Sequence, residues 1–168
     1  RRWLFNRVLA APKTREAMQI TARQEGRSER AVERRARRIL EGMGADFRFG
    51  MIIFLRLLLD LITSRIYDGV EFGAADVERI REASRNGTVL LLPSHRSHFD
   101  YLLLSWLLYH QGMMPPHIAA GANLSFWPMG AILRKGGAFF IRRSFQGDEL
   151  YSRLVAQYLR TLIAEGYV

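Results

Sequence analysis

Apolar residues follow different patterns in the two halves of this chain. In residues 1–84, long stretches favour helices, and in residues 85–168 short continuous apolar runs alternate with helical stretches. The helices are expected at 14–41, 47–67, 74–84, 99–111, 126–135 and 148–165, and the strands at 88–92, 117–121 and 138–141. This alternation predicts an α/β fold with a mainly parallel sheet and flanking helices. We therefore divide the chain into a helical N-terminal region, residues 1–84, and the first part of an α/β domain, residues 85–168.

The most distinctive stretch follows the first expected strand. Residues 88–92 form an apolar run closed by Pro93, which is the pattern of a strand buried on both faces. Two histidines, two serines, an arginine and an aspartate then occur between Ser94 and Asp100. Because open α/β sheets bind ligands beyond the carboxyl ends of their strands, we expect a functional site here.

His95 and Asp100 have a spacing that suits a general base and the acid that orients it. If Ser97 caps the following helix, a tight turn can bring the His95 imidazole over the first helical turn. Asp100 is held ionised there by the positive end of the helix and fixes the tautomer of the ring. The outward ring nitrogen then works near its ordinary pKa of ~6.5. Such a base suits the deprotonation of a hydroxyl on a bound substrate.

Other interpretations of this stretch stay open. Ser97 and Asp100 match a capping box, which by itself would account for both residues. His95 and His98 can be ordinary polar loop residues. A zinc site made of His95, His98 and Asp100 is less favoured because no further cluster of ligands follows. The serines lack the Gly-x-Ser-x-Gly turn that exposes a nucleophile.

A second polar cluster follows the third expected strand. Arg142 and Arg143 come directly after residues 138–141. Right-handed crossovers place the carboxyl ends of parallel strands on one edge of a sheet. We therefore expect His95 and the two arginines to share a cleft, although an arginine pair at a strand end is most often simply solvated.

Charge and composition narrow the set of partners. The chain has 25 Lys+Arg against 16 Asp+Glu, a net charge of +9, and no cysteine. This excludes disulfides and thiolate chemistry and favours polyanions as partners. The arginine-rich part of residues 14–41 lacks aromatic residues that could stack on bases, so a solvated helix face is favoured over nucleic-acid contact.

In residues 47–67, Arg56 and Asp60 interrupt the apolar run at a spacing that allows pairing. This disfavours a transmembrane span and favours a buried helix or one in the membrane surface.

Three segments carry a family resemblance. His95-Arg-Ser-His-Phe-Asp100 resembles the His-x-x-x-x-Asp motif of the glycerolipid acyltransferases. Residues 115–128 and 136–143 resemble more specifically the bacterial membrane-bound glycerol-3-phosphate 1-O-acyltransferases. Roughly residues 89–145 are covered by the resemblance.

The resemblance implies acyl transfer from acyl-CoA or an acyl carrier protein thioester to the sn-1 hydroxyl of glycerol 3-phosphate. The product is lysophosphatidic acid, and the reaction is the first step of phospholipid synthesis. His95 is implied as the base and Asp100 as the residue that orients it, with Arg143 on the substrate's phosphate. The other implied substrate-binding residues are Arg96, Ser97, Gly137, Phe140, Ile141 and Arg142.

The resemblance also implies a peripheral location on an anionic membrane, at the cytoplasmic face of the bacterial inner membrane. It implies no nucleic-acid partner and no metal or cofactor beyond the thioester co-substrate. The family's third block, Glu-Gly-x-x-Ser-Arg, is absent, since no Ser-Arg follows Glu165-Gly166, and so is the fourth. We therefore expect the chain to be a fragment of a longer enzyme. The alternatives are a dihydroxyacetone-phosphate acyltransferase and a basic module that binds anionic surfaces without catalysis.

Overall fold

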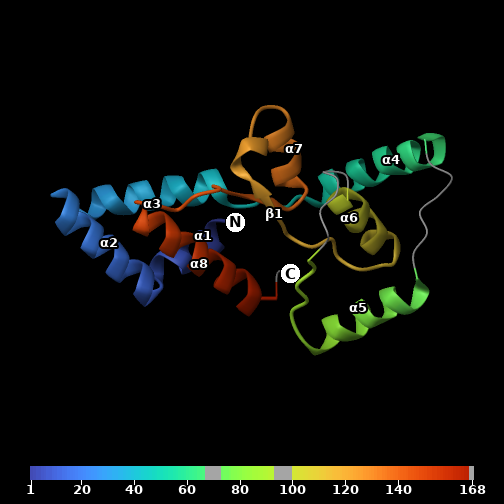
Figure 1. Ribbon diagram of the computed structural model, residues 1–168, viewed down its shortest axis with the longest axis horizontal. Coiled ribbons are helices and arrows are strands. Elements are labelled where there is room, and N and C mark those ends of the chain that lie inside the picture. Colours follow the sequence, from blue (N-terminus) through green and yellow to red (C-terminus); the bar gives the residue numbers. More distant parts are fainter. Residues whose placement is uncertain (67–72, 93–99, 167–168) are drawn as a thin grey trace.

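The computed structural model describes residues 1–66, 73–92 and 100–166. At one end of its long axis α1, α2, α3 and α8 pack together, and at the other end lie α4, α5 and α6, with β1 and α7 between (Figure 1). The helices are α1 (Arg2–Ala10), α2 (Pro12–Glu25), α3 (Glu29–Met43), α4 (Phe49–Ile66), α5 (Ala74–Asn86), α6 (Asp100–His110), the 3-10 helix η1 (Ala122–Leu124), α7 (Met129–Lys135) and α8 (Glu149–Ala164). The strands are β1 (Ile118–Gly121) and β2 (Ala138–Ile141). Except at residues 14–41 and 88–92, the predicted ranges lie close to these bounds.

The long helix predicted for residues 14–41 is in fact two helices. α2 begins at Pro12, whose fixed φ suits the first helical position, and it is followed by Gly26 in the left-handed conformation, with a φ of 62°. The Ser28 hydroxyl then accepts a hydrogen bond from the Ala31 N–H at 3.4 Å and caps α3. Because the chain reverses between these two signals, α2 and α3 pack side by side (Figure 1).

The main core lies where α8 packs against the three N-terminal helices. Leu40 and Leu154 are fully buried there, and Phe139 of β2 packs on the Tyr158 ring, with 5.6 Å between ring centres. The hydroxyl of Tyr158 accepts a hydrogen bond from the Ala45 N–H at 3.1 Å. Burial raises the pKa of Tyr158, so this hydroxyl stays protonated. One hydrophobic core thus contains residues from both ends of the chain. The boundary between the helical N-terminal region and the α/β domain, placed between residues 84 and 85, stays a prediction.

The two strands form a parallel sheet, with Gly121 opposite Ile141 at its carboxyl edge. Because successive side chains of a strand alternate between faces, Phe139 joins the main core and Phe140 joins a second cluster on the other face. The second cluster contains Ala120, Leu133, Ala138 and Phe140, with Tyr101, Leu102, Ile118 and Leu124 packed against it. Parallel strands flanked by helices confirm the predicted α/β class.

Residues 88–92 do not form the buried strand that was predicted. They have no sheet pairing, and Leu90 and Leu92 are 71% and 84% exposed. A strand needs hydrogen bonds to a neighbour, and within the described residues β1 pairs with β2 alone. The Thr88 hydroxyl instead donates to the Ile163 carbonyl at 3.0 Å. The prediction was wrong because an apolar run indicates a tendency to be buried, not the presence of a partner strand.

Arg134, near the end of α7, ties that helix to the end of α3. Its Nη1 donates to the carbonyls of Gly44 at 2.7 Å and Glu41 at 3.3 Å, and its Nη2 donates to the carbonyl of Gly42 at 2.8 Å. The last carbonyls of a helix have no partner within the helix, so a guanidinium satisfies them well. The same group lies 4.8 Å from the centre of the Phe140 ring. Arg134 therefore links the helical bundle to the sheet.

Asp60 of α4 contacts α6, although its spacing from Arg56 would also allow a pair within α4. Its Oδ1 accepts a hydrogen bond from Trp106 Nε1 at 2.6 Å and lies 2.8 Å from His110 Nε2. Burial raises the pKa of Asp60, but these two hydrogen bonds and the positive charges of His110 and Arg56 outweigh it, so the pKa lies below its ordinary value. The carboxylate thus fastens α4 to α6, because these partners on the neighbouring helix come within hydrogen-bonding distance.

Candidate active site

The described residues include only part of the predicted site. His95, Arg96 and Ser97 lie outside them, so their arrangement stays a prediction. Asp100 is the first residue of α6, where the positive end of a helix stabilises a carboxylate. The next residue, Tyr101, packs against the second cluster, and burial raises the pKa of its hydroxyl. The start of α6 is therefore held over the sheet face that carries Phe140.

The two predicted arginines lie at the carboxyl edge of the sheet, where β2 ends. Arg142 is held in place: its Nη1 donates to Asp148 Oδ2 at 3.1 Å, and its guanidinium lies 4.4 Å from the centre of the Tyr151 ring. Its backbone N–H donates to the Tyr151 hydroxyl at 3.0 Å. Arg143 is exposed and has no hydrogen bond or ion pair to any residue in the described part of the chain. Arg143 is thus available to a ligand, whereas Arg142 is already engaged.

Three other predicted binding residues belong to the framework of this edge. Phe140 is 3% exposed beneath the Arg134 guanidinium, and Ile141 packs against the main core. Gly137 precedes β2 at its opposite end, with a φ of 105°, and a side chain there would approach the Phe47 ring to 3.1 Å. These residues hold β2 in position, and their direct contact with substrate stays a prediction.

Sequence reasoning missed Asp148, which organises the carboxyl edge from the start of α8. Its Oδ1 accepts a hydrogen bond from the Tyr151 N–H at 3.0 Å, which makes Asp148 the N-cap of α8. The same oxygen lies 3.4 Å from Arg35 Nη2, while Oδ2 pairs with Arg142. An Asp-Glu pair before a helical stretch signals a cap. That signal does not predict which arginines the carboxylate will pair with in the folded protein.

Asp148 borders a basic hollow that we call the arginine groove. The groove has a volume of about 560 Å³ and lies between α3 and the segment that joins β2 to α8. Its charged lining residues are Arg27, Arg34, Arg35, Arg38, Arg142 and Asp148. The arginine-rich part of α3, predicted to be a solvated face, therefore forms one wall of a hollow at the edge of the sheet.

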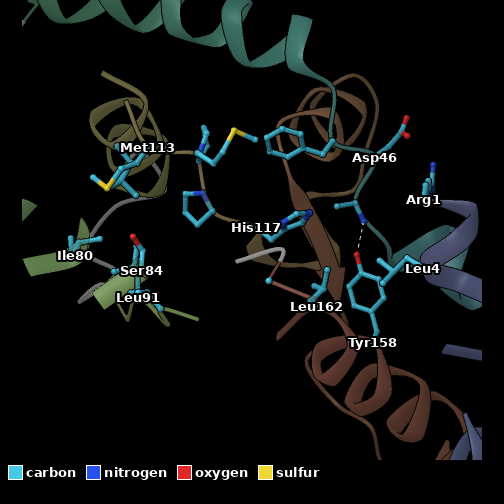
Figure 2. Close-up of a pocket in the computed structure, with 18 of the residues that line it drawn as sticks. Arg1, Leu4, Asp46, Ile80, Ser84, Leu91, Met113, His117, Tyr158 and Leu162 are labelled. Carbon is cyan, nitrogen blue, oxygen red and sulfur yellow. Dashed lines mark hydrogen bonds between the residues drawn. The ribbon is translucent and has the colours of Figure 1, made fainter. Parts of the chain in front are cut away.

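A second hollow, the apolar pocket, lies beside the amino end of β1 (Figure 2). It has a volume of about 690 Å³ and is bordered by α5, residues 88–92, the segment that joins α6 to β1, and the end of α8. Figure 2 shows Ile80, Leu91 and Met113 on one side and Leu4 and Tyr158 on the other. Arg1, Asp46, Ser84 and His117 also line it, so its apolar walls carry polar groups as well.

Comparison with known proteins identifies the family. The sequence model of the family described as Acyltransferase matches residues 74–168. The chain belongs to the Acyltransferase family. The matched residues run from α5 onward, so they include the His95–Asp100 motif, the sheet, and the two arginines at its carboxyl edge.

Three curated relatives match nearly the whole chain. The glycerol-3-phosphate acyltransferase of Pseudoalteromonas atlantica is 43% identical over 168 residues, which is 99% of this chain and 20% of the relative. The glycerol-3-phosphate acyltransferases of Pasteurella multocida and Aeromonas hydrophila are each 42% identical, over 98% and 99% of this chain and 20% and 21% of their own lengths. The chain thus spans about one fifth of the length of these acyltransferases. The resemblance to glycerol-3-phosphate acyltransferases is confirmed.

Proposed function

We propose that the intact protein transfers an acyl group from a thioester to the primary hydroxyl of glycerol 3-phosphate, giving lysophosphatidic acid. One observation carries the proposal. The His95–Asp100 motif and the Arg142–Arg143 pair fall inside the Acyltransferase match, in a chain whose relatives are named glycerol-3-phosphate acyltransferases. The exposed position of Arg143 at the carboxyl edge of a parallel sheet supports a role in holding the phosphate.

The proposed chemistry needs a base, a held acceptor and a leaving thiolate. His95 takes the proton of the primary hydroxyl while the hydroxyl oxygen attacks the carbonyl carbon of the thioester. The new C–O bond forms, the C–S bond breaks, and the departing thiolate of coenzyme A or of an acyl carrier protein receives the proton from His95. Asp100, in the first turn of α6, keeps the imidazole in the tautomer that accepts the proton. We propose no cofactor beyond the thioester co-substrate.

Acyl transfer by the intact protein to glycerol 3-phosphate and to dihydroxyacetone phosphate tests this function, in the wild type and in Arg143→Ala. We expect the wild type to prefer glycerol 3-phosphate. Arg143→Ala should raise the KM for glycerol 3-phosphate about tenfold, because a hydrogen bond to a charged group contributes ~1.5–3 kcal/mol. The kcat should change much less, because this contact has the same strength in the bound ground state and in the transition state. Steady-state kinetics at saturating acyl donor measures both constants.

Arg160→Ala is the matched control, because Arg160 is an exposed arginine of α8. Its KM should equal that of the wild type. An unchanged KM in Arg143→Ala would remove the phosphate role from that residue. A preference for dihydroxyacetone phosphate would establish the alternative acceptor, and binding to anionic surfaces with no transfer to either acceptor would favour the non-catalytic module.

We also propose that α4 holds the protein on an anionic membrane, at the cytoplasmic face of the bacterial inner membrane. α4 exposes four apolar side chains on one side, each between 41% and 55% exposed: Phe54, Leu57, Leu58 and Leu61. Arg48 precedes the helix and Arg65 lies in its last turn. No helix within the described ranges is long and apolar enough to cross a bilayer. An exposed apolar ridge in a chain with a net charge of +9 supports docking on anionic lipid.

Vesicle binding tests the role of α4. The double variant Leu57→Glu/Leu61→Glu should lower the partition onto vesicles with anionic lipid by about tenfold or more, because burying one leucine contributes ~1.5–3 kcal/mol. Sedimentation with vesicles of anionic and of zwitterionic lipid measures this partition. The control is Ile20→Glu, which changes an exposed isoleucine of α2. Equal loss of binding in the control, or none in the double variant, would contradict the assignment to α4.

A further inference from the structure

The geometry points to a ligand class for the arginine groove: we propose that it binds a phosphate monoester, with Arg34 and Arg38 of α3 among the contacts. The inference rests on the proposed function, because the proposed reaction has two substrates that carry such a phosphate. These are glycerol 3-phosphate and the phosphorylated end of a coenzyme A donor. Neither arginine lies in the motif segments or within residues 74–168, which match the Acyltransferase family. The site residues would therefore extend into the helical N-terminal region.

The buried stripe of α3 determines which of its arginines reach the groove. Val32, Ala36 and Leu40 recur every fourth residue and are at most 1% exposed, so they turn one side of the helix into the main core. Arg34 and Arg38, also four residues apart, lie on a different side and both line the groove. Core packing therefore sets the rotation of α3 that directs the two guanidinium groups to the same hollow.

A carboxylate engages other arginines of the groove and leaves these two available. Asp148 pairs with Arg35 and Arg142, and Arg35 also pairs with Glu25. Arg34 and Arg38 are exposed and have no hydrogen bond or ion pair to any residue that the structure describes. Asp148 thus holds Arg35 and Arg142 in fixed positions, while Arg34 and Arg38 keep their donors for a ligand.

The groove is more than the solvated face of a charged helix. Arg37, on the same helix, donates to Asn6 Oδ1 at 3.1 Å, lies 4.0 Å from Glu33, and does not line the groove. Arg30 is exposed and also lies outside the groove lining. The arginines of α3 therefore divide into a set that faces the carboxyl edge of the sheet and a set that does not. Arg30 provides a matched control for this difference.

The position and charge of the groove favour a phosphate. Ala122 and Ser125, which follow β1, and Arg142, which follows β2, all line it, so the groove lies at the carboxyl edge where parallel sheets bind ligands. Its lining has five arginines and a single acidic residue. A phosphate monoester carries close to two negative charges, and its oxygens match the donor fork of a guanidinium. Such a ligand would also relieve the repulsion among the arginines.

Calorimetric titration of the intact protein tests the inference, with glycerol 3-phosphate and adenosine 3′,5′-bisphosphate as separate probes. The wild type should bind at least one probe. Arg34→Ala/Arg38→Ala should weaken that binding about tenfold or more, since charge-assisted hydrogen bonds to phosphate are among the strong ones. Arg30→Ala should stay within about twofold of the wild type. The probe that loses affinity identifies the source of the phosphate. If circular dichroism shows that the double variant is unfolded, the single variants Arg34→Gln and Arg38→Gln replace it.

Two results would overturn the assignment: neither probe binds the wild type, or the arginine variants bind as tightly as the wild type. Acyl transfer measured in parallel separates this inference from the proposed function. Normal acyl transfer with unchanged probe affinity in the variants would reject phosphate binding in the groove and leave the proposed acyltransferase function standing. Probe binding through Arg34 and Arg38 in a protein without transferase activity would support phosphate binding in the groove and reject the proposed acyltransferase function.

Discussion

Replacing His95 with alanine is expected to lower the turnover number of the intact protein by about 10²–10⁴-fold, which is the usual contribution of a general base. In the proposed reaction the imidazole takes the hydroxyl proton, and alanine leaves only water for this task. The KM for glycerol 3-phosphate should change little, because in the proposed site the phosphate is held by arginine and not by His95. Single-turnover kinetics with a saturating thioester measures the chemical step, and circular dichroism confirms that the variant is folded.

The neighbouring histidine of the same motif segment supplies the control. His98→Ala removes an identical side chain three residues away and should keep turnover within a few-fold of the wild type. Asp100→Asn should lower turnover less than His95→Ala, because an amide at the start of α6 can still hold the ring but no longer stabilises its charged form. Substantial turnover by a folded His95→Ala protein would reject the acyltransferase mechanism.

Arg134→Ala is expected to lower the free energy of unfolding by about 2–4 kcal/mol, because each hydrogen bond between a charged and a neutral group contributes ~1.5–3 kcal/mol and the contributions overlap. The guanidinium donates to three carbonyls at the end of α3, those of Glu41, Gly42 and Gly44, and packs over Phe140. Its loss leaves these carbonyls without that donor and weakens the connection between the helical bundle and α7. Urea denaturation followed by circular dichroism measures the change.

Lys135→Ala, next to Arg134 on α7, is the control and should stay within about 0.5 kcal/mol of the wild type. The Lys135 backbone carbonyl, which accepts a hydrogen bond from the Arg48 N–H at 2.9 Å, is unaffected by this change. Arg134→Lys should recover part of the stability, since one ammonium cannot reach all three carbonyls. A fully stable Arg134→Ala protein would show that backbone hydrogen bonds and hydrophobic contacts are enough to join α7 to the bundle.

Most elements could be predicted from the sequence because their signals are local. The strand at residues 138–141 is an apolar run that starts after Gly136-Gly137 and ends at Arg142, and its bounds match β2. The apolar stretch at 47–67 and the helix at 148–165 end close to the bounds of α4 and α8. The motif between Ser94 and Asp100 and the Arg142–Arg143 pair were also visible as patterns, and they led to the correct family.

The sequence by itself thus determined the α/β class, the family, and which residue types are available for chemistry. Only the tertiary structure decided which partners they meet. Residues 88–92 have the composition of a strand but no strand beside them, and Asp60 contacts α6 instead of Arg56. The sequence showed that α3 is rich in arginine. Core packing around Leu40 and the position of Asp148 determine that some of these arginines face the edge of the sheet. The reason is physical: local propensity depends on neighbours along the chain, whereas pairing, burial and the walls of a hollow depend on residues that are distant in sequence and meet only in the folded protein.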